Sequence, residues 1–298
     1  MRTFRNALRK IGVWGRILLY VLVVVVIGVV INISGCANSA FYYPTRTIYE
    51  TPDKHGIEYE TVSFASRDGT RLSGWFLPAR NTSGATDARG ARGTVIHFHG
   101  NAQNMTSHWR YVGWLPARGF NVLVFDYRGY GASGGTPTQR GLFEDSQAAL
   151  DYARSRPDVD ATRLLVFGQS LGGNNAIAAV GAGNRAGVRA VAEESTFFSY
   201  SFIANEKISS GGLLVGNEYS AGKYVAALSP IPLLMIHGTA DQVVSYKNAE
   251  RLFEAAREPK QLITIEGGGH TDALSEIRGN TYRDALVRFF EEALENNL

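Results

Sequence analysis

The sequence predicts an α/β fold, with a mostly parallel central sheet, helices on both of its faces and a small helical insertion. Short, almost uninterrupted apolar runs recur along the chain, and most are followed by a segment with helical spacing. Uninterrupted apolar runs are typical of parallel strands buried on both faces. Alternation of strands and helices is typical of a parallel sheet. The stretch 36–298 has a length that suits one domain of this class.

The strands are predicted from these runs. The alternating run 57–64 and the run 71–77 flank the turn Arg67-Asp68-Gly69, which predicts an antiparallel hairpin. The remaining strands are expected at 94–98, 122–125, 164–167, 188–193, 232–237 and 261–265.

Helices are predicted between the strands. One covers 105–115 and ends near Pro116 and Gly119; another covers 138–154 and is capped by Thr138. Further helices are expected at 171–181, 246–256 and, as a closing amphipathic helix, 280–296. Residues 79–93, rich in Gly, Ala, Arg, Ser and Thr, are predicted to form a surface loop.

Ser170 is the first candidate catalytic residue. Residues 168–172 read Gly-Gln-Ser-Leu-Gly and directly follow the apolar run that ends at Phe167. Such a motif in a loop would usually be a flexible turn. Between a buried strand and a helix, however, it favours a sharp turn that displays a nucleophilic serine and needs small residues on both sides. The helix that begins beneath the serine favours negative charge beside the hydroxyl.

A base and an acid follow in workable chain order. Asp241 lies just past the strand predicted at 232–237, and His270 lies just past the strand predicted at 261–265. The carboxyl ends of parallel strands form one crevice, where ligands bind. A serine hydroxyl needs an imidazole to take its proton and a carboxylate to orient the imidazole. Ser170, Asp241 and His270 are therefore the predicted catalytic triad.

The predicted oxyanion hole uses two backbone N–H groups. The strand 94–98 ends in His99-Gly100-Asn101, and the N–H of Asn101 together with that of Leu171 could stabilise a tetrahedral oxyanion.

These motifs together resemble those of a known superfamily. The segments 99–104 (HGNAQN), 125–134 (FDYRGYGASG), 168–173 (GQSLGG), 237–241 (HGTAD) and 269–270 (GH) resemble the α/β-hydrolase motif set, and in particular that of its BEM46-like serine hydrolases. The resemblance extends from about Phe41 to the C-terminus. It implies the α/β-hydrolase fold and a triad of Ser170, Asp241 and His270, but it does not define a substrate. The chain departs from the common pattern at Gln103, where such loops often carry Gly.

Other polar residues in the sequence are alternative candidates for the acid or for a metal site. Glu194 is the alternative acid, because some hydrolases place the carboxylate after the strand at 188–193. His97 and His99 alternate like metal ligands, but no third ligand motif accompanies them. No metal and no cofactor are therefore expected.

The segment 197–228 interrupts the alternation of strands and helices. It contains several aromatic residues and a Gly-Gly pair at 211–212. It lies where this superfamily often inserts a cap, so we predict a small helical cap over the site, with Phe198 and Phe202 binding substrate. The alternative is that these aromatic residues only pack the domain surface.

The N-terminal 35 residues are predicted to form a targeting unit. Five basic residues up to Arg16 precede the apolar run 17–31, and no acidic residue occurs before Glu50. The following Ile-Ser-Gly-Cys, with Cys36 as the sole cysteine, resembles a bacterial lipoprotein signal in which the cysteine is lipidated. An uncleaved signal anchor is the alternative. Both place the catalytic domain, residues 36–298, at the membrane of the bacterial cell envelope and outside the cytoplasm.

The distribution of charge argues against a nucleic acid as the partner of this protein. The formal net charge of +3 is smaller than the contribution of the five basic residues before Ile17, so the rest of the chain is slightly acidic. No basic stripe suggests nucleic acid. The predicted triad and the resemblance to the α/β-hydrolases lead us to expect a serine hydrolase acting on a small-molecule ester, thioester or related acyl compound. A peptidase or amidase, or a membrane-anchored non-catalytic binding protein, are the alternatives.

Overall fold

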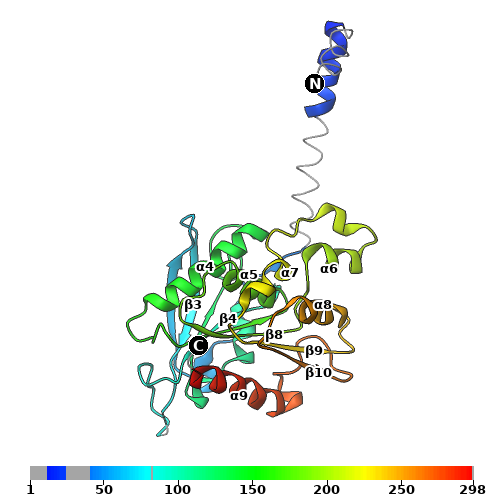
Figure 1. Ribbon diagram of the computed structural model, residues 1–298. Coiled ribbons are helices and arrows are strands. Elements are labelled where there is room, and N and C mark those ends of the chain that lie inside the picture. Colours follow the sequence, from blue (N-terminus) through cyan, green and yellow to red (C-terminus); the bar gives the residue numbers. More distant parts are fainter. Residues whose placement is uncertain (1–11, 25–40, 82, 297–298) are drawn as a thin grey trace.

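The computed structural model describes residues 12–24, 41–81 and 83–296. Its centre is an eight-stranded sheet in the order β10-β9-β8-β7-β4-β6-β3-β2 (Figure 1). The strand pairs from β10 to β6 are parallel, whereas β3 pairs antiparallel with both β6 and β2. The strands are β2 (Glu60–Ala65), β3 (Arg71–Leu77), β4 (Thr94–Phe98), β6 (Asn121–Phe125), β7 (Leu164–Gln169), β8 (Val188–Glu194), β9 (Leu233–Gly238) and β10 (Lys260–Ile265).

Two apolar layers hold the sheet between helices. Every residue of β4, β6 and β7 is buried, as expected for strands covered on both faces. One layer packs α4 (Gln139–Ser155), α5 (Leu171–Gly181) and α8 (Lys247–Ala255) on the sheet. The other packs α9 (Thr281–Glu295) on the opposite face, as Figure 1 shows. The predicted α/β fold is confirmed.

Most predicted elements match the structure closely. The strands at 71–77 and 94–98 and the helix at 171–181 are confirmed residue for residue. Helix α4 begins after Thr138, whose hydroxyl accepts the Gly141 N–H at 3.0 Å. This is the N-cap expected from the sequence.

The helix predicted at 105–115 is wrong in length. Only α3 (Met105–His108) is α-helical, and a 3-10 turn at Trp109–Tyr111 follows it. The N–H groups of Val112 and Gly113 both donate to the Trp109 carbonyl. A Cβ at Gly113 would lie 2.6 Å from the Trp109 ring, so glycine permits this tight turn in place of a regular helix.

The first strand also begins later than predicted. Residues Pro52–His55 form a 3-10 turn, and the Ile57 N–H bonds to the Pro52 carbonyl, so β2 starts only at Glu60. A small sheet was not predicted at all. In it β1 (Tyr43–Pro44) pairs parallel with β5 (Ala102–Gln103).

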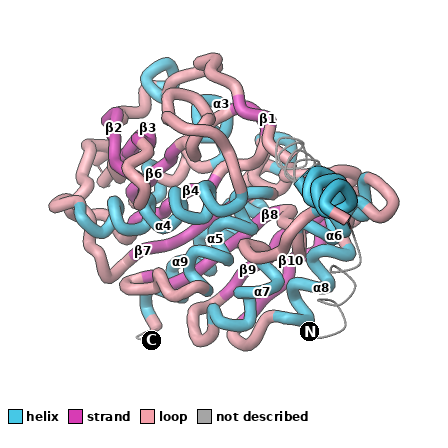
Figure 2. The backbone as a smooth tube through the Cα atoms, turned by 90° about the horizontal axis from the view of Figure 1, so that it is seen from above, coloured by secondary structure: helices cyan, strands magenta, loops and turns pink. Residues whose placement is uncertain are grey.

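The segment 197–228 is largely helical. It contains α6 (Tyr200–Lys207), α7 (Ala221–Tyr224) and two 3-10 turns at Gly211–Leu214 and Val225–Leu228. Figure 2 shows α6 beside α8, and the Arg251 side chain of α8 lies over the Phe202 ring of α6.

Residues 13–24 are helical near the N-terminus, and their apolar side chains are largely exposed. In the parts of the chain that the structure describes, no helix combines the length and the apolar character needed to span a bilayer. Cys36 and most of the predicted targeting unit, residues 1–11 and 25–35, lie outside the described residues.

Candidate active site

Ser170 lies on a strained turn between β7 and α5. Its φ angle is +53°, a left-handed value that costs energy for any residue with a Cβ. The turn is held from outside, because the Ser170 N–H donates to the Glu194 carbonyl at 2.8 Å and the Thr196 hydroxyl donates to the Ser170 carbonyl at 2.8 Å. The surrounding structure therefore maintains a conformation that the local chain would not adopt by itself.

The glycines of the motif are required by close packing. A Cβ at Gly168 would lie 2.5 Å from Gly172, and one at Gly172 would lie 1.9 Å from the Phe98 carbonyl oxygen. One at Gly173 would lie 1.7 Å from the Thr196 hydroxyl. Contacts below 3.0 Å leave no room for a side chain, so the backbone around Ser170 can close only on glycine.

Helix α5 begins immediately after the serine. Leu171 is its first residue, so the Leu171 N–H has no carbonyl acceptor within the helix. The helix dipole adds partial positive charge at the same end. The Leu171 N–H is thus available to an anion beside the Ser170 hydroxyl, as the predicted oxyanion hole requires.

His270 and Asp241 are joined by a short hydrogen bond. The His270 Nδ1 lies 2.7 Å from the Asp241 Oδ2. The other carboxylate oxygen, Oδ1, accepts the N–H groups of Val243 and Val244 at 2.8 and 2.9 Å. Asp241 is buried, whereas 21 % of the His270 side chain is exposed. A fixed, buried carboxylate therefore orients an accessible imidazole.

The charge of Asp241 is stabilised despite its burial. Burial alone would raise the pKa of this carboxyl, but hydrogen bonds from His237 and His270 outweigh burial and hold the pKa well below its usual range. Burial also lowers the pKa of His237, yet the hydrogen bond to Asp241 and the charge of Glu193 raise it overall. Asp241 is consequently ionised at neutral pH, as a residue that stabilises an imidazolium must be.

Glu194, the alternative acid, has other partners. Its carboxylate accepts the Gln169 side-chain N–H at 2.8 Å and the Ala273 N–H at 2.8 Å. The His270 Nδ1 is bonded to Asp241 instead. Burial raises the pKa of Glu194 to about 7. Of the two carboxylates, Asp241 is the one in contact with the histidine.

The loop after β4 is braced by residues that sequence reasoning missed. The side-chain oxygen of Asn101 accepts the Tyr43 N–H at 3.2 Å and the Tyr130 hydroxyl at 2.9 Å. The pairing of β1 with β5 fixes the residues that follow. Gln103 has a φ of +66°, the left-handed conformation for which glycine is favoured, so the departure noted in the sequence coincides with real backbone strain.

Three histidines lie around this loop. His97 is buried and its Nε2 lies 3.2 Å from the Gln169 side-chain oxygen, while the His99 Nδ1 lies 2.7 Å from the Gly100 carbonyl. Burial and the neighbouring His99 lower the pKa of His108 to about 4, and burial lowers that of His97 well below its usual range. Both imidazoles are therefore neutral at pH 7. Within the described part of the chain, no group of three or more His, Cys, Asp or Glu side chains could hold a metal ion.

The cap residues predicted to bind substrate contact one another and the neighbouring helices. The rings of Phe198 and Phe202 lie 6.5 Å apart, and the Arg251 guanidinium lies 4.2 Å from the Phe202 ring centre. A Cβ at Gly222 would lie 2.5 Å from the Phe198 ring, so that ring packs directly on α7. The Phe198 ring thus packs on α7, and the Phe202 ring packs on the Arg251 side chain of α8.

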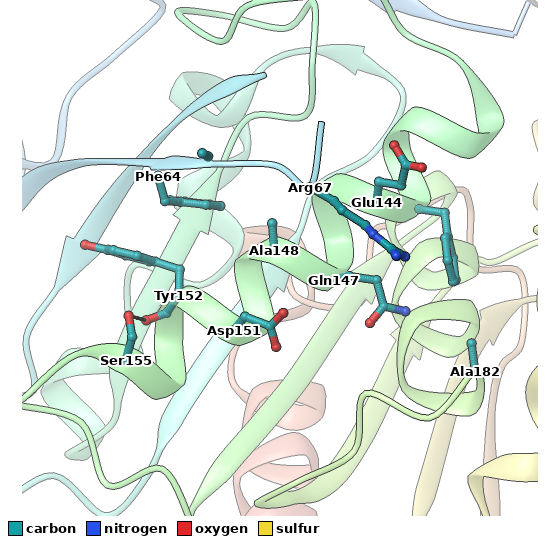
Figure 3. Close-up of a pocket in the computed structure, with 11 residues that line it drawn as sticks. Phe64, Arg67, Glu144, Gln147, Ala148, Asp151, Tyr152, Ser155 and Ala182 are labelled. Atoms are coloured by element: carbon teal, nitrogen blue, oxygen red, sulfur yellow. Dashed lines mark hydrogen bonds between the residues drawn. The ribbon is translucent and has the colours of Figure 1, made fainter. Parts of the chain in front are cut away.

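An open pocket of about 810 Å³ lies away from the triad. Figure 3 shows it between β2 and α4, where the Phe64 and Tyr152 rings stack at 4.6 Å. Its wall includes Ala182, which follows α5, whereas Ser170 precedes that helix. At 1.5 Å per residue, Ser170 and Ala182 are about 18 Å apart along the helix axis, so this pocket is separate from Ser170.

Comparisons with known proteins identify the family of this chain. Residues 105–297 match the prolyl oligopeptidase family. The chain is 50% identical to the protein YfhR of Escherichia coli O157:H7 over 87% of this chain and 88% of that one. It is 31% identical to the protein bem46 of Schizosaccharomyces pombe over 69% of this chain and 68% of that one.

A solved structure supports the fold in particular. The Pyrococcus furiosus esterase Pf2001 superimposes with a TM-score of 0.67 and 20% identity, covering 86% of this chain and 98% of that one. The protein belongs to the prolyl oligopeptidase family and has the α/β-hydrolase fold.

Proposed function

We propose that this protein is a serine hydrolase that cleaves an ester, thioester or related acyl compound through an acyl-enzyme intermediate. The observation that carries the proposal is the combination of Ser170 on its strained turn with the 2.7 Å bond between His270 and Asp241. A strained, glycine-lined turn and a carboxylate-oriented histidine are the two parts that activate a serine hydroxyl.

In the proposed mechanism, His270 acts first as a base and then as an acid. With Nδ1–H donated to Asp241, the Nε2 of His270 is free to take the proton of the Ser170 hydroxyl. The serine oxygen then bonds to the acyl carbon, and the negative charge on the carbonyl oxygen is stabilised by the N–H groups of Leu171 and Asn101. His270 gives the proton to the leaving group as its bond to the acyl carbon breaks. Water, deprotonated by the same histidine, then bonds to the acyl carbon. The bond to Ser170 breaks, and His270 returns the proton to the serine oxygen as the acid leaves.

The direct test is labelling with a fluorophosphonate, which bonds covalently to an activated serine. We expect the wild-type protein to be labelled on Ser170, identified by mass spectrometry of the modified peptide. Ser170→Ala is the matched control and should not react. Absence of labelling in the folded wild-type protein would contradict the proposal and favour a membrane-anchored binding protein with a vestigial site.

A peptidase or amidase is the second candidate, favoured by the match to the prolyl oligopeptidase family over residues 105–297. An ester and an amide with the same acyl group separate the two activities, because only the leaving group differs. We expect a higher kcat/KM for the ester. A preference for the amide would reverse the assignment.

We propose further that the segment 197–228 acts as a cap and sets the acyl-chain preference. Aromatic side chains offer apolar walls to an acyl group. Replacing Phe198 or Phe202 by Ala should change the ratio of kcat/KM between long and short p-nitrophenyl esters more than it changes kcat on the acetate. Phe64→Ala, in the pocket of Figure 3, is a control outside the site. An unchanged chain-length profile in both cap variants would exclude the cap from substrate selection.

We also propose that the protein is held at the membrane of the cell envelope, with its catalytic domain outside the cytoplasm, through a lipid on Cys36. The basic and apolar N-terminal segments and the Ile-Ser-Gly-Cys motif support this. One acyl chain binds a membrane weakly, so a cysteine carrying two or three chains is expected. Mass spectrometry of the mature N-terminus distinguishes a lipoprotein from an uncleaved anchor. A lipid-modified peptide beginning at Cys36 supports the proposal. A membrane-bound protein that retains residues 1–16 would show an uncleaved anchor.

A further inference from the structure

The end of β8 lies at the centre of the sheet, between the strand of the nucleophile and the strand of the acid. In the sheet order, β8 stands between β7 and β9 (Figure 1). Residues 194–196, which we call the β8 corner, begin with the last residue of β8 and are almost completely buried, with exposures of 1%, 1% and 0%. The corner is therefore within reach of all three segments that carry the triad.

The β8 corner holds the nucleophile turn by three hydrogen bonds. The Glu194 carbonyl accepts the Ser170 N–H, and the Glu194 carboxylate accepts the side-chain N–H of Gln169, both at 2.8 Å. The Thr196 hydroxyl donates to the Ser170 carbonyl at 2.8 Å. Both backbone polar groups of the catalytic serine are thus bonded to this corner.

The same corner holds the histidine loop and the acid strand. The Thr271 N–H, next to His270, donates to the Ser195 hydroxyl at 3.1 Å, and the Ala273 N–H donates to the Glu194 carboxylate at 2.8 Å. The Ser195 N–H donates to the Ile236 carbonyl of β9, five residues before Asp241. One carboxylate therefore bridges the nucleophile turn and the histidine loop.

The backbone is strained at the β8 corner and in the two loops that it bonds. Five residues other than glycine have a positive φ in the described chain, and three of them meet here: Ser170 at +53°, Ser195 at +58° and Thr271 at +52°. Such conformations cost energy and persist only where the surroundings impose them. Burial, which disfavours the charged form, also raises the pKa of Glu194 to about 7, so this carboxyl is held at a further energetic cost.

We propose that Glu194 and Ser195 are positioning residues that hold Ser170 and His270 in the relative position that proton transfer requires. Neither touches the substrate; each acts through the loop that it bonds. The inference rests on the proposed function, in which Ser170 is the nucleophile. Errors of about 1 Å in the placement of reacting groups can lower rates about 100-fold, so the effect should appear in kcat.

The test compares variants of the full-length protein. Glu194→Ala leaves two buried N–H donors without an acceptor and should lower kcat on p-nitrophenyl acetate about 100-fold, with KM changed by less than about threefold. Ser195→Ala removes one bond to the histidine loop and should lower kcat about tenfold. Glu194→Gln should keep activity within about tenfold of wild type, because its side-chain oxygen can still accept the Ala273 N–H. The Gln169 amide can turn over to accept from the new NH₂ group, and the neutral His97 can change tautomer to accept from Gln169 in turn.

Two matched controls separate positioning from packing. Asn121→Ala, at the first residue of β6, removes a buried side-chain oxygen that accepts the Ala79 N–H at 2.9 Å. Ser146→Ala removes a buried hydroxyl that bonds to Leu142 within α4. Both should retain kcat within about twofold of wild type while showing losses in Tm comparable with those of the corner variants, as typical single substitutions do.

The rate of fluorophosphonate labelling gives a second readout that needs no substrate. Slower labelling of Glu194→Ala and Ser195→Ala than of the controls supports the proposal. Labelling and kcat equal to those of the controls, or losses confined to KM, would overturn it. If Glu194→Ala does not fold, the proposal is tested by comparing the kcat and the labelling rate of Ser195→Ala and Glu194→Gln with those of the controls. If wild type itself is not labelled, the proposed function fails first, which is a distinct result.

Discussion

Ser170→Ala should abolish nearly all hydrolysis, with kcat falling on the order of 10⁵-fold, as in other enzymes that use this triad. His270→Ala should lose about as much, and the double variant little more, because the two residues act as one unit. The measurement is kcat on a p-nitrophenyl ester, with enzyme concentrations high enough to detect residual turnover.

The fold should survive these substitutions. Alanine at position 170 keeps a Cβ at the same φ of +53°, and the backbone bonds from Ser170 to Glu194 and Thr196 do not involve the hydroxyl. The Tm measured by circular dichroism should therefore stay close to that of wild type. Near-normal turnover by a folded Ser170→Ala protein would refute the mechanism.

Asp241→Asn should cause the second large loss, with kcat lowered about 10⁴-fold. The substitution retains an oxygen that can accept the N–H groups of Val243 and Val244, but an amide cannot hold His270 in the tautomer that leaves Nε2 as the base. Glu194→Gln is the matched variant, since it also exchanges a buried carboxyl for an amide. It should lose far less, and a larger loss there would make Glu194 the acid.

The titration of Asp241 should not appear in the pH dependence of kcat. Hydrogen bonds from His237 and His270 hold the pKa of Asp241 well below its usual range, so it stays ionised wherever a typical aspartate would. An acidic limb of the wild-type pH–rate profile should then come from groups other than Asp241. A limb that disappears in Asp241→Asn while kcat stays high would contradict this.

Local sequence determined the nucleophile turn and most of the framework. The glycines at 168, 172 and 173 are there because a Cβ would strike a neighbouring backbone or side chain, and this requirement is visible as a motif. The uninterrupted apolar runs gave the strands β4 and β7, because burial on both faces leaves no polar position. Chain order placed Asp241 and His270 past strand ends, and the structure joins them at 2.7 Å.

Only the tertiary structure decided contacts between segments distant in the chain. Chain position favoured Asp241 over Glu194 as the acid, but both carboxylates follow strands of one sheet edge. Only the structure shows that the imidazole of His270 bonds to Asp241, whereas Glu194 bonds to the backbone of the same loop. Two further contacts join residues 29 or more positions apart: the pairing of β1 with β5 and the hydrogen bond from Tyr130 to Asn101. No local sequence pattern predicts such contacts. Periodicity and turn motifs report interactions over a few residues, whereas the register of the catalytic groups is set by hydrogen bonds that exist only after the sheet has assembled.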